Sequence, residues 1–130
     1  ERSSNRDALR VVHQMAEALQ QGDVVAVFPE GGTGDGVTLL PFHANLLQAA
    51  ISADAPIQPI ALQFLEAQSG AKSFAPCYHA DDTLLGSLWR TLCAPPLLAQ
   101  VRYGDTQHAE GKTRREWADA LRSDVENLLK

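Results

Sequence analysis

The sequence predicts a single α/β domain with a mainly parallel sheet flanked by helices. Helical and strand-like segments follow one another in the order helix, strand, helix, strand, helix, strand, helix. Residues 24–28 (VVAVF) form a continuous apolar run, which is typical of a strand buried on both faces of a parallel sheet. The chain has 130 residues, 45% of them hydrophobic, which is enough for one core. Residues 1–130 are therefore expected to form part or all of one domain.

The first half of the chain is expected to hold two helices around the apolar run. Asn5 can cap a helix that ends near Gly22, a glycine in the usual place of a C-terminal stop. After a glycine-rich loop, Pro41 can begin a second helix that runs to about Ala53. Its apolar positions recur at helical spacing and should face the core: Phe42, Leu46, Leu47, Ala50 and Ile51.

The second half is expected to add two strands and two helices. Residues 55–64 end in a strand-like alternation, residues 65–80 read as a loop or a short excursion strand, and residues 97–103 alternate again. Asp82 can cap a helix with a stripe of large apolar residues, Leu84, Leu85, Leu88, Trp89 and Leu92. A last helix is expected over residues 113–129, with Trp117, Leu121, Val125 and Leu128 facing inward.

Composition excludes several classes of function. The net charge is −5 and the pI about 5.2, so the chain has no basic footprint for nucleic acid. No apolar run reaches the length of a membrane span, and no signal peptide is visible. The two cysteines, Cys77 and Cys93, match no metal-ligand spacing. We therefore expect neither a nucleic-acid partner nor a metal site.

A glycine-rich segment follows the first predicted strand and is the main candidate for a site. It reads Phe28-Pro29-Glu30-Gly31-Gly32-Thr33-Gly34-Asp35-Gly36. Ligands of open α/β sheets gather at the carboxyl ends of strands, and glycines let a ligand approach the backbone. The glycine spacing fails the dinucleotide fingerprint by one residue, and no lysine occurs in residues 1–71 to complete a P-loop. A plain strand-to-helix turn remains the alternative to a binding loop.

Three motifs in this order resemble the glycerolipid acyltransferases, typified by 1-acyl-glycerol-3-phosphate acyltransferase. They are Phe28-Pro29-Glu30-Gly31, then Leu40-Pro41-Phe42, then the block Ala55-Pro56-Ile57-Gln58-Pro59-Ile60. The pair Glu1-Arg2 is similar to the end of the family's preceding block, and the stretch Ser87-Leu88-Trp89-Arg90 resembles one bacterial branch. The resemblance covers most of the chain.

The resemblance implies transfer of a fatty acyl group from acyl-CoA or acyl-carrier protein to a lysolipid hydroxyl, with no other cofactor. It implies substrate-binding roles for ten residues: Arg2, Phe28, Pro29, Glu30, Gly31, Gly32, Thr33, Phe42, Pro56 and Pro59. It also implies a peripheral position at the cytoplasmic face of the membrane.

The family's catalytic His-x-x-x-x-Asp motif is absent. Five positions after His13, His43, His79 and His108 stand Ala18, Gln48, Leu84 and Thr113. Because the family's histidine and aspartate precede its second block, we expect them upstream of Glu1, and nominate no catalytic residue here. The chain is then expected to be the acceptor-binding, C-terminal portion of one acyltransferase domain, inactive alone and with an exposed apolar surface that could dimerise or bind detergent. The alternative is a non-catalytic lipid- or protein-binding module that keeps the groove.

Two further expectations concern the acceptor. Gly32-Thr33 stands where the family usually has Thr-Arg, so a guanidinium suited to an acceptor phosphate is missing. This weakens the case for lysophosphatidate and leaves other lysolipids, such as a lyso-aminolipid, as candidates; Arg2 or the loop amides could still supply positive charge. For Glu30 we expect a positioning role, and the alternative is a carboxylate that caps loop amides.

Overall fold

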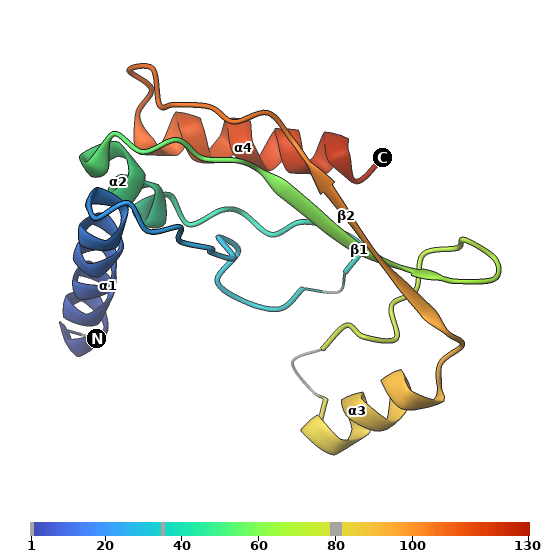
Figure 1. The fold of residues 1–130 in the computed structure, drawn as a ribbon. Coiled ribbons are helices and arrows are strands. Elements are labelled where there is room, and N and C mark those ends of the chain that lie inside the picture. The colour runs from blue at the N-terminus through green and yellow to red at the C-terminus, as the bar shows by residue number, and fades with distance from the viewer. Residues whose placement is uncertain (1, 35, 79–81) are drawn as a thin grey trace.

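The computed structural model describes residues 2–34, 36–78 and 82–130, apart from the side chains of residues 2–7. Four helices and two strands follow in the order α1, α2, β1, α3, β2 and α4 (Figure 1). The α/β class is thus confirmed in its general form, with one sheet of two strands in the described part of the chain. None of the described helices is long and apolar enough to cross a membrane.

Helices α1 (Arg2–Gln20) and α2 (Ala44–Ala53) pack against each other at one end of the molecule (Figure 1). Helix α1 ends as Gly22 predicts. Gly22 has φ +88°, and the amides of Gly22 and Asp23 bond back to the carbonyls of Leu19 and Ala18, which forms a Schellman motif. Helix α2 ends on Asp54, a non-glycine residue with φ +49°.

Strands β1 (Ile60–Glu66) and β2 (Leu97–Tyr103) form an antiparallel ribbon, with Ile60 opposite Tyr103 and Glu66 opposite Leu97. Between the strands the chain makes an excursion. It first folds back on β1 through a turn in which the Glu66 amide bonds to the Ala71 carbonyl, and then forms α3 (Leu84–Cys93). Of the loop or short excursion strand expected over residues 65–80, the described residues 65–78 contain a turn and one bridge, Leu65 to Lys72, and residues 79 and 80 lie outside the described part of the chain.

The prediction of a mainly parallel sheet is wrong. Residues 24–28 are not in a strand, and Val24 and Phe28 are 98% and 85% exposed. The run has the composition of a buried strand, but a strand needs a partner, and within the described residues neither the sheet nor the isolated bridges include residues 24–28. A local pattern of apolar residues thus overestimated both the strand character and the burial of this segment.

Three helix starts also differ from expectation. Helix α1 begins at Arg2, before the expected cap Asn5, and α2 begins at Ala44 after Pro41. Helix α3 is capped by Thr83, whose hydroxyl accepts the Gly86 amide, and not by Asp82. In all three cases the helix is present and begins within a few residues of the expected start.

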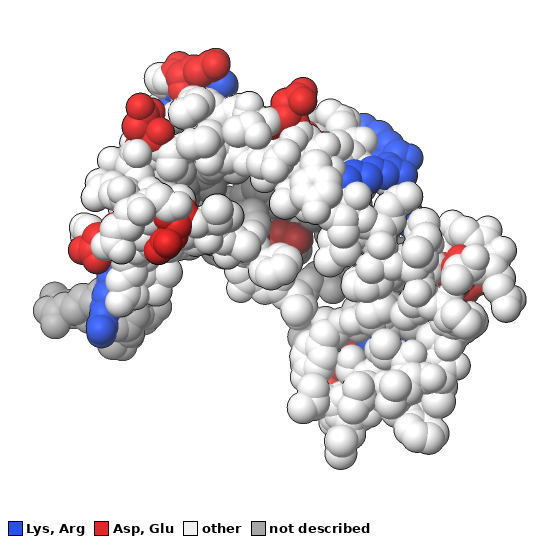
Figure 2. Space-filling view, viewed as in Figure 1, with Lys and Arg blue, Asp and Glu red and all other residues white. Residues whose placement is uncertain are grey.

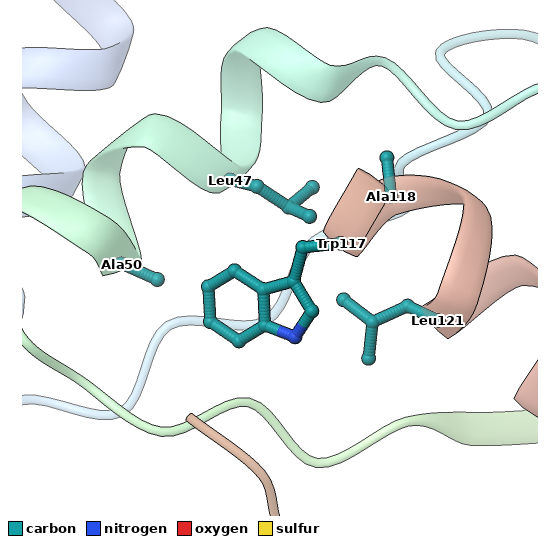
Figure 3. Close-up of a cluster of buried hydrophobic side chains, with 5 residues drawn as sticks. All are labelled: Leu47, Ala50, Trp117, Ala118 and Leu121. Atoms are coloured by element: carbon teal, nitrogen blue, oxygen red, sulfur yellow. The ribbon is translucent and has the colours of Figure 1, made fainter. Parts of the chain in front are cut away.

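The core lies where α4 (Arg114–Leu128) packs on α2 and β1. Trp117 is fully buried and projects from α4 towards α2, where Leu47 and Ala50 contact it (Figure 3). Its indole N–H donates to Gln107 Oε1 at 3.3 Å. The inward positions expected from helical spacing in α2 and α4 are therefore confirmed, with Phe42, Leu46 and Ile51 packed at the edge of this cluster.

Candidate functional site

A tight turn at residues 28–31 starts the candidate site. The Gly31 amide bonds to the Phe28 carbonyl at 3.2 Å, which places Pro29 and Gly31 at the second and fourth positions that favour such a turn. The Pro29 carbonyl accepts the His43 amide at 2.7 Å. This bond ties the turn to the start of α2, so residues 30–42 form a closed loop.

Glu30 fixes the other side of that loop. Its Oε2 accepts the backbone N–H of Leu40 at 2.8 Å, in a partly buried position. The carboxylate therefore does what the alternative interpretation expected, because it caps a loop amide. The same bond holds the carboxylate in one place, so that its second oxygen keeps a fixed position at the loop.

Two glycines are required by the packing of this loop. Gly31 has φ +64°, and a Cβ there would lie 2.6 Å from His43 Nε2 and closer still to Cδ2. Gly36 has φ +77°, and a Cβ there would lie 2.6 Å from Cys77 Sγ and 3.0 Å from Phe74 Cδ1. The absence of a side chain therefore lets the loop approach His43 at Gly31 and the excursion after β1 at Gly36.

A hollow of about 550 Å³ opens between this loop, β1, the excursion and the end of α4. Figure 2 shows the red surface of an acidic residue inside the concavity between the end of the molecule that holds α1 and α2 and the end that holds α3. The loop contributes Glu30, Gly32, Thr33, Gly34, Gly36, Val37, Thr38 and Leu39; the other elements contribute Leu62, Gln63, Phe64, Lys72, Ser73, Phe74, Cys77, Tyr78, Glu126, Leu129 and Lys130. The hollow combines an apolar wall with charged groups of both signs, which suits an amphipathic ligand.

Three of the ten predicted binding residues line this hollow: Glu30, Gly32 and Thr33. Pro29 and Gly31 shape the turn behind it, and Phe28 is exposed beside that turn. Phe42 packs against the core, Pro56 is exposed, and Pro59 is buried next to Gly104. Arg2 lies in α1, and its side chain is outside the described part of the chain.

The positive charge of the hollow comes from two lysines that the sequence motifs do not include, Lys72 and Lys130. Lys72 donates to the Leu129 carbonyl at 3.3 Å, and Lys130 donates to Asn127 Oδ1 at 2.8 Å. Both lysines lie far from the glycine loop in sequence, and neither belongs to a motif. Arg122 was also missed; its guanidinium donates to the Leu39 carbonyl at 2.9 Å and so ties the loop to α4.

The histidines offer no catalytic pair in the described part of the chain. His13 Nδ1 lies 3.0 Å from the Leu9 carbonyl on its own helix, and His108 lies 3.8 Å from exposed Asp54. The ring of His43 packs under Gly31, behind the hollow. His79 lies outside the described residues. Among residues 2–34, 36–78 and 82–130, no three His, Cys, Asp or Glu side chains come together as metal ligands.

Comparisons with known proteins place similar sequences among the acyltransferases. Residues 1–63 match the family model described as Acyltransferase. The chain is 37% identical over 102 residues to 1-acyl-sn-glycerol-3-phosphate acyltransferases of Neisseria gonorrhoeae and Neisseria meningitidis, a match that covers 78% of this chain and 39% of each relative. It is 32% identical over 117 residues to the lyso-ornithine lipid O-acyltransferase of Pseudomonas aeruginosa, covering 90% of this chain and 45% of that protein.

These relatives are enzymes that transfer acyl groups. The chain belongs to the glycerolipid acyltransferase family, as its motifs predict. It spans about two fifths of the length of the first curated relatives that it matches. No solved structure matches the chain.

Proposed function

We propose that the full-length protein transfers a fatty acyl group from an acyl-CoA or acyl-carrier-protein thioester to the hydroxyl of a lysolipid. The chain described here would supply the acceptor side of the site. The observation that carries this proposal is the hollow beside Glu30, in which a fixed carboxylate meets apolar side chains and exposed backbone. The names of the relatives support the same reaction class.

The reaction needs a base and no further cofactor. The acceptor oxygen attacks the thioester carbonyl carbon, the C–S bond breaks, and the hydroxyl proton passes through a base to the leaving thiolate. The thioester is already activated, so no redox or metal step is required. Because this chain lacks His-x-x-x-x-Asp, we assign the base to the family's dyad in the full-length protein and no proton transfer to Glu30.

We assign Glu30 a positioning role. Its bond to the Leu40 amide holds the glycine loop closed, and the loop in turn forms one wall of the hollow. If the bond is lost, the Leu40 N–H is left unpaired and the wall is free to move. The acceptor would then be held less often in the geometry that the chemistry requires.

The charged lining favours an acceptor that carries both signs of charge. Glu30 and Glu126 face the hollow together with Lys72 and Lys130, whereas the arginine that would suit a phosphate is absent from the loop. We therefore expect a lysolipid with an amino-acid head group to be used better than lysophosphatidate. Such an acceptor is a membrane lipid, which is why we place the full-length protein at the cytoplasmic face of the membrane.

The test is steady-state acylation by the full-length protein with both kinds of lysolipid. Loss of one buried hydrogen-bond partner costs about 1–3 kcal/mol, so Glu30→Ala should lower kcat/KM by roughly tenfold to a hundredfold. Glu30→Gln keeps an oxygen for the Leu40 amide and should lose less. Glu17→Ala, at an exposed position of α1, is the matched control. Equal kinetics for Glu30→Ala and Glu17→Ala would remove Glu30 from the site, and absence of acyl transfer to any lysolipid would overturn the proposed function.

A further inference from the structure

Helix α3 carries more exposed large apolar side chains than any other described helix. Its five large apolar side chains are between 53% and 78% exposed: Leu84, Leu85, Leu88, Trp89 and Leu92. The spacing predicted correctly that they share one face, but that face does not pack on the core. In Figure 1, α3 stands apart from α1, α2 and α4, at the far end of the β ribbon.

The attachment of α3 to the rest of the protein is polar. Ser87 is the buried residue of this helix, and Thr91 Oγ1 bonds to the Ala75 carbonyl at 3.1 Å. Arg90 bonds to the carbonyls of Ala75 and Cys77 and forms an ion pair with Asp82 at 2.7 Å. The usual arrangement of a surface helix is thus reversed, because polar groups face the protein and apolar groups face outward.

The position of α3 relates this face to the hollow. The segment of residues 72–78 holds α3 through the carbonyls of Ala75 and Cys77, and the same segment lines the hollow with Lys72, Phe74 and Tyr78. Helix α3 therefore lies next to the place where, on the proposed function, a lysolipid would enter. A lysolipid has its acyl chain in the bilayer, so the mouth of its site must lie at the membrane surface.

We propose that the apolar face of α3 docks on the lipid bilayer and positions the hollow at the membrane surface. The helix has 10 residues, about 15 Å of length, which suits a helix lying in the interface. It contains no acidic residue, and its one charged residue, Arg90, is occupied by Asp82. Trp89, at 71% exposure in the middle of the face, is the residue type that prefers the headgroup region. The proposal rests on the proposed function for its choice of a bilayer over other apolar surfaces.

The test uses the full-length protein and vesicles of phosphatidylethanolamine and phosphatidylglycerol. Leu85→Glu and Leu88→Glu should each weaken vesicle binding in sedimentation by about tenfold or more, since a charge replaces a side chain that would be buried in lipid. The matched control is Leu9→Glu, an exposed leucine of α1 at 61% exposure. Brominated lipids should quench tryptophan fluorescence in the parent protein, and Trp89→Phe should remove that quenching while binding persists.

Other occupants give different results. If a second copy covers α3, Leu88→Glu will change the oligomeric state without vesicles; if another segment of the full-length chain covers it, Trp89 will be shielded from acrylamide without vesicles. Either result, or equal vesicle binding by Leu88→Glu and Leu9→Glu, overturns the inference.

Acylation of a short-chain, water-soluble lysolipid separates this inference from the proposed function. The α3 variants should retain that activity, whereas failure of the proposed function would abolish it in every variant, the parent included.

Discussion

Replacement of Gly31 by alanine tests the geometry of the glycine loop directly. An L-residue in the left-handed region costs about 1–2 kcal/mol. The new Cβ would lie 2.6 Å from His43 Nε2, so the imidazole must leave its rotamer at a further cost of about 0.5–1.5 kcal/mol. We therefore expect Gly31→Ala to lower the free energy of unfolding by about 2–3 kcal/mol, a large part of the roughly 5–15 kcal/mol of a typical domain.

The chain offers a control at the next position. A Cβ on Gly32 would meet no atom within 4 Å, and Gly32 does not have a positive φ. Gly32→Ala should therefore change the stability little. His43→Ala combined with Gly31→Ala should recover the part of the loss that comes from the ring, about 0.5–1.5 kcal/mol, and leave the backbone part. The backbone bond from His43 to Pro29 remains in that double variant.

The measurement is urea unfolding of the four variants and the parent, followed by far-UV circular dichroism. We expect Gly32→Ala to be the most stable of three variants, the double variant to be intermediate and Gly31→Ala to be the least stable. His43→Ala is the reference for the double-mutant cycle. If Gly31→Ala is as stable as Gly32→Ala, the turn does not have the described conformation. If adding His43→Ala to Gly31→Ala recovers none of the lost stability, the ring does not lie under Gly31.

Three further predictions concern the core, a helix cap and the tie between loop and α4. Trp117→Ala should destabilise the protein by about 3–5 kcal/mol in thermal or urea unfolding, because the side chain is fully buried. Bonds from the amide and hydroxyl of Thr113 lower the pKa of Glu116. The stability that Glu116 adds is therefore present at neutral pH and is lost as the pH falls through that lowered pKa. The difference in stability between the parent and Glu116→Gln in urea should narrow once the pH falls below the ordinary pKa of glutamate, about 4.3. Arg122→Met removes the donor to the Leu39 carbonyl and should raise KM for the lysolipid more than it lowers kcat in steady-state assays.

The parts of the fold that follow from local signals were predictable. Thr113 and Glu116 form a capping box, followed by apolar residues at helical spacing, and α4 begins where this signature predicts. Gly22 ends α1 for a similarly local reason. In each case the residues that decide the structure lie within a few positions of one another, so the sequence carries the whole signal.

The burial of two apolar segments could not be predicted from local sequence. Residues 24–28 and the α3 stripe have the patterns of buried elements, yet Phe28 and Trp89 are largely exposed. A period in the sequence tells which side chains share a face, whereas burial depends on what that face meets. The neighbour of a strand or helix comes from another part of the chain or from outside it, and its identity is not written in the segment itself.

In the candidate site, too, the residues of a contiguous motif were predictable and the residues brought in from other parts of the chain were not. Glu30, Gly32 and Thr33 came from a contiguous motif and line the hollow. Lys72 and Tyr78 reach it only because the chain reverses after β1, with the Glu66 amide bonded to the Ala71 carbonyl. That reversal brings residues of ordinary local sequence to the glycine loop, so no motif marked them.

The exposed segment of residues 24–28 has a practical consequence for anyone who produces this chain alone. Its five residues are uncharged, mostly β-branched and free of proline, which is the composition that drives identical chains to stack edge to edge into fibrils. Val24, at 98% exposure, offers a surface position where a single lysine would oppose such stacking by charge repulsion without disturbing the core. We therefore expect Val24→Lys to raise the solubility of a recombinant preparation, although the position lies outside both the hydrophobic centre and the ligand hollow.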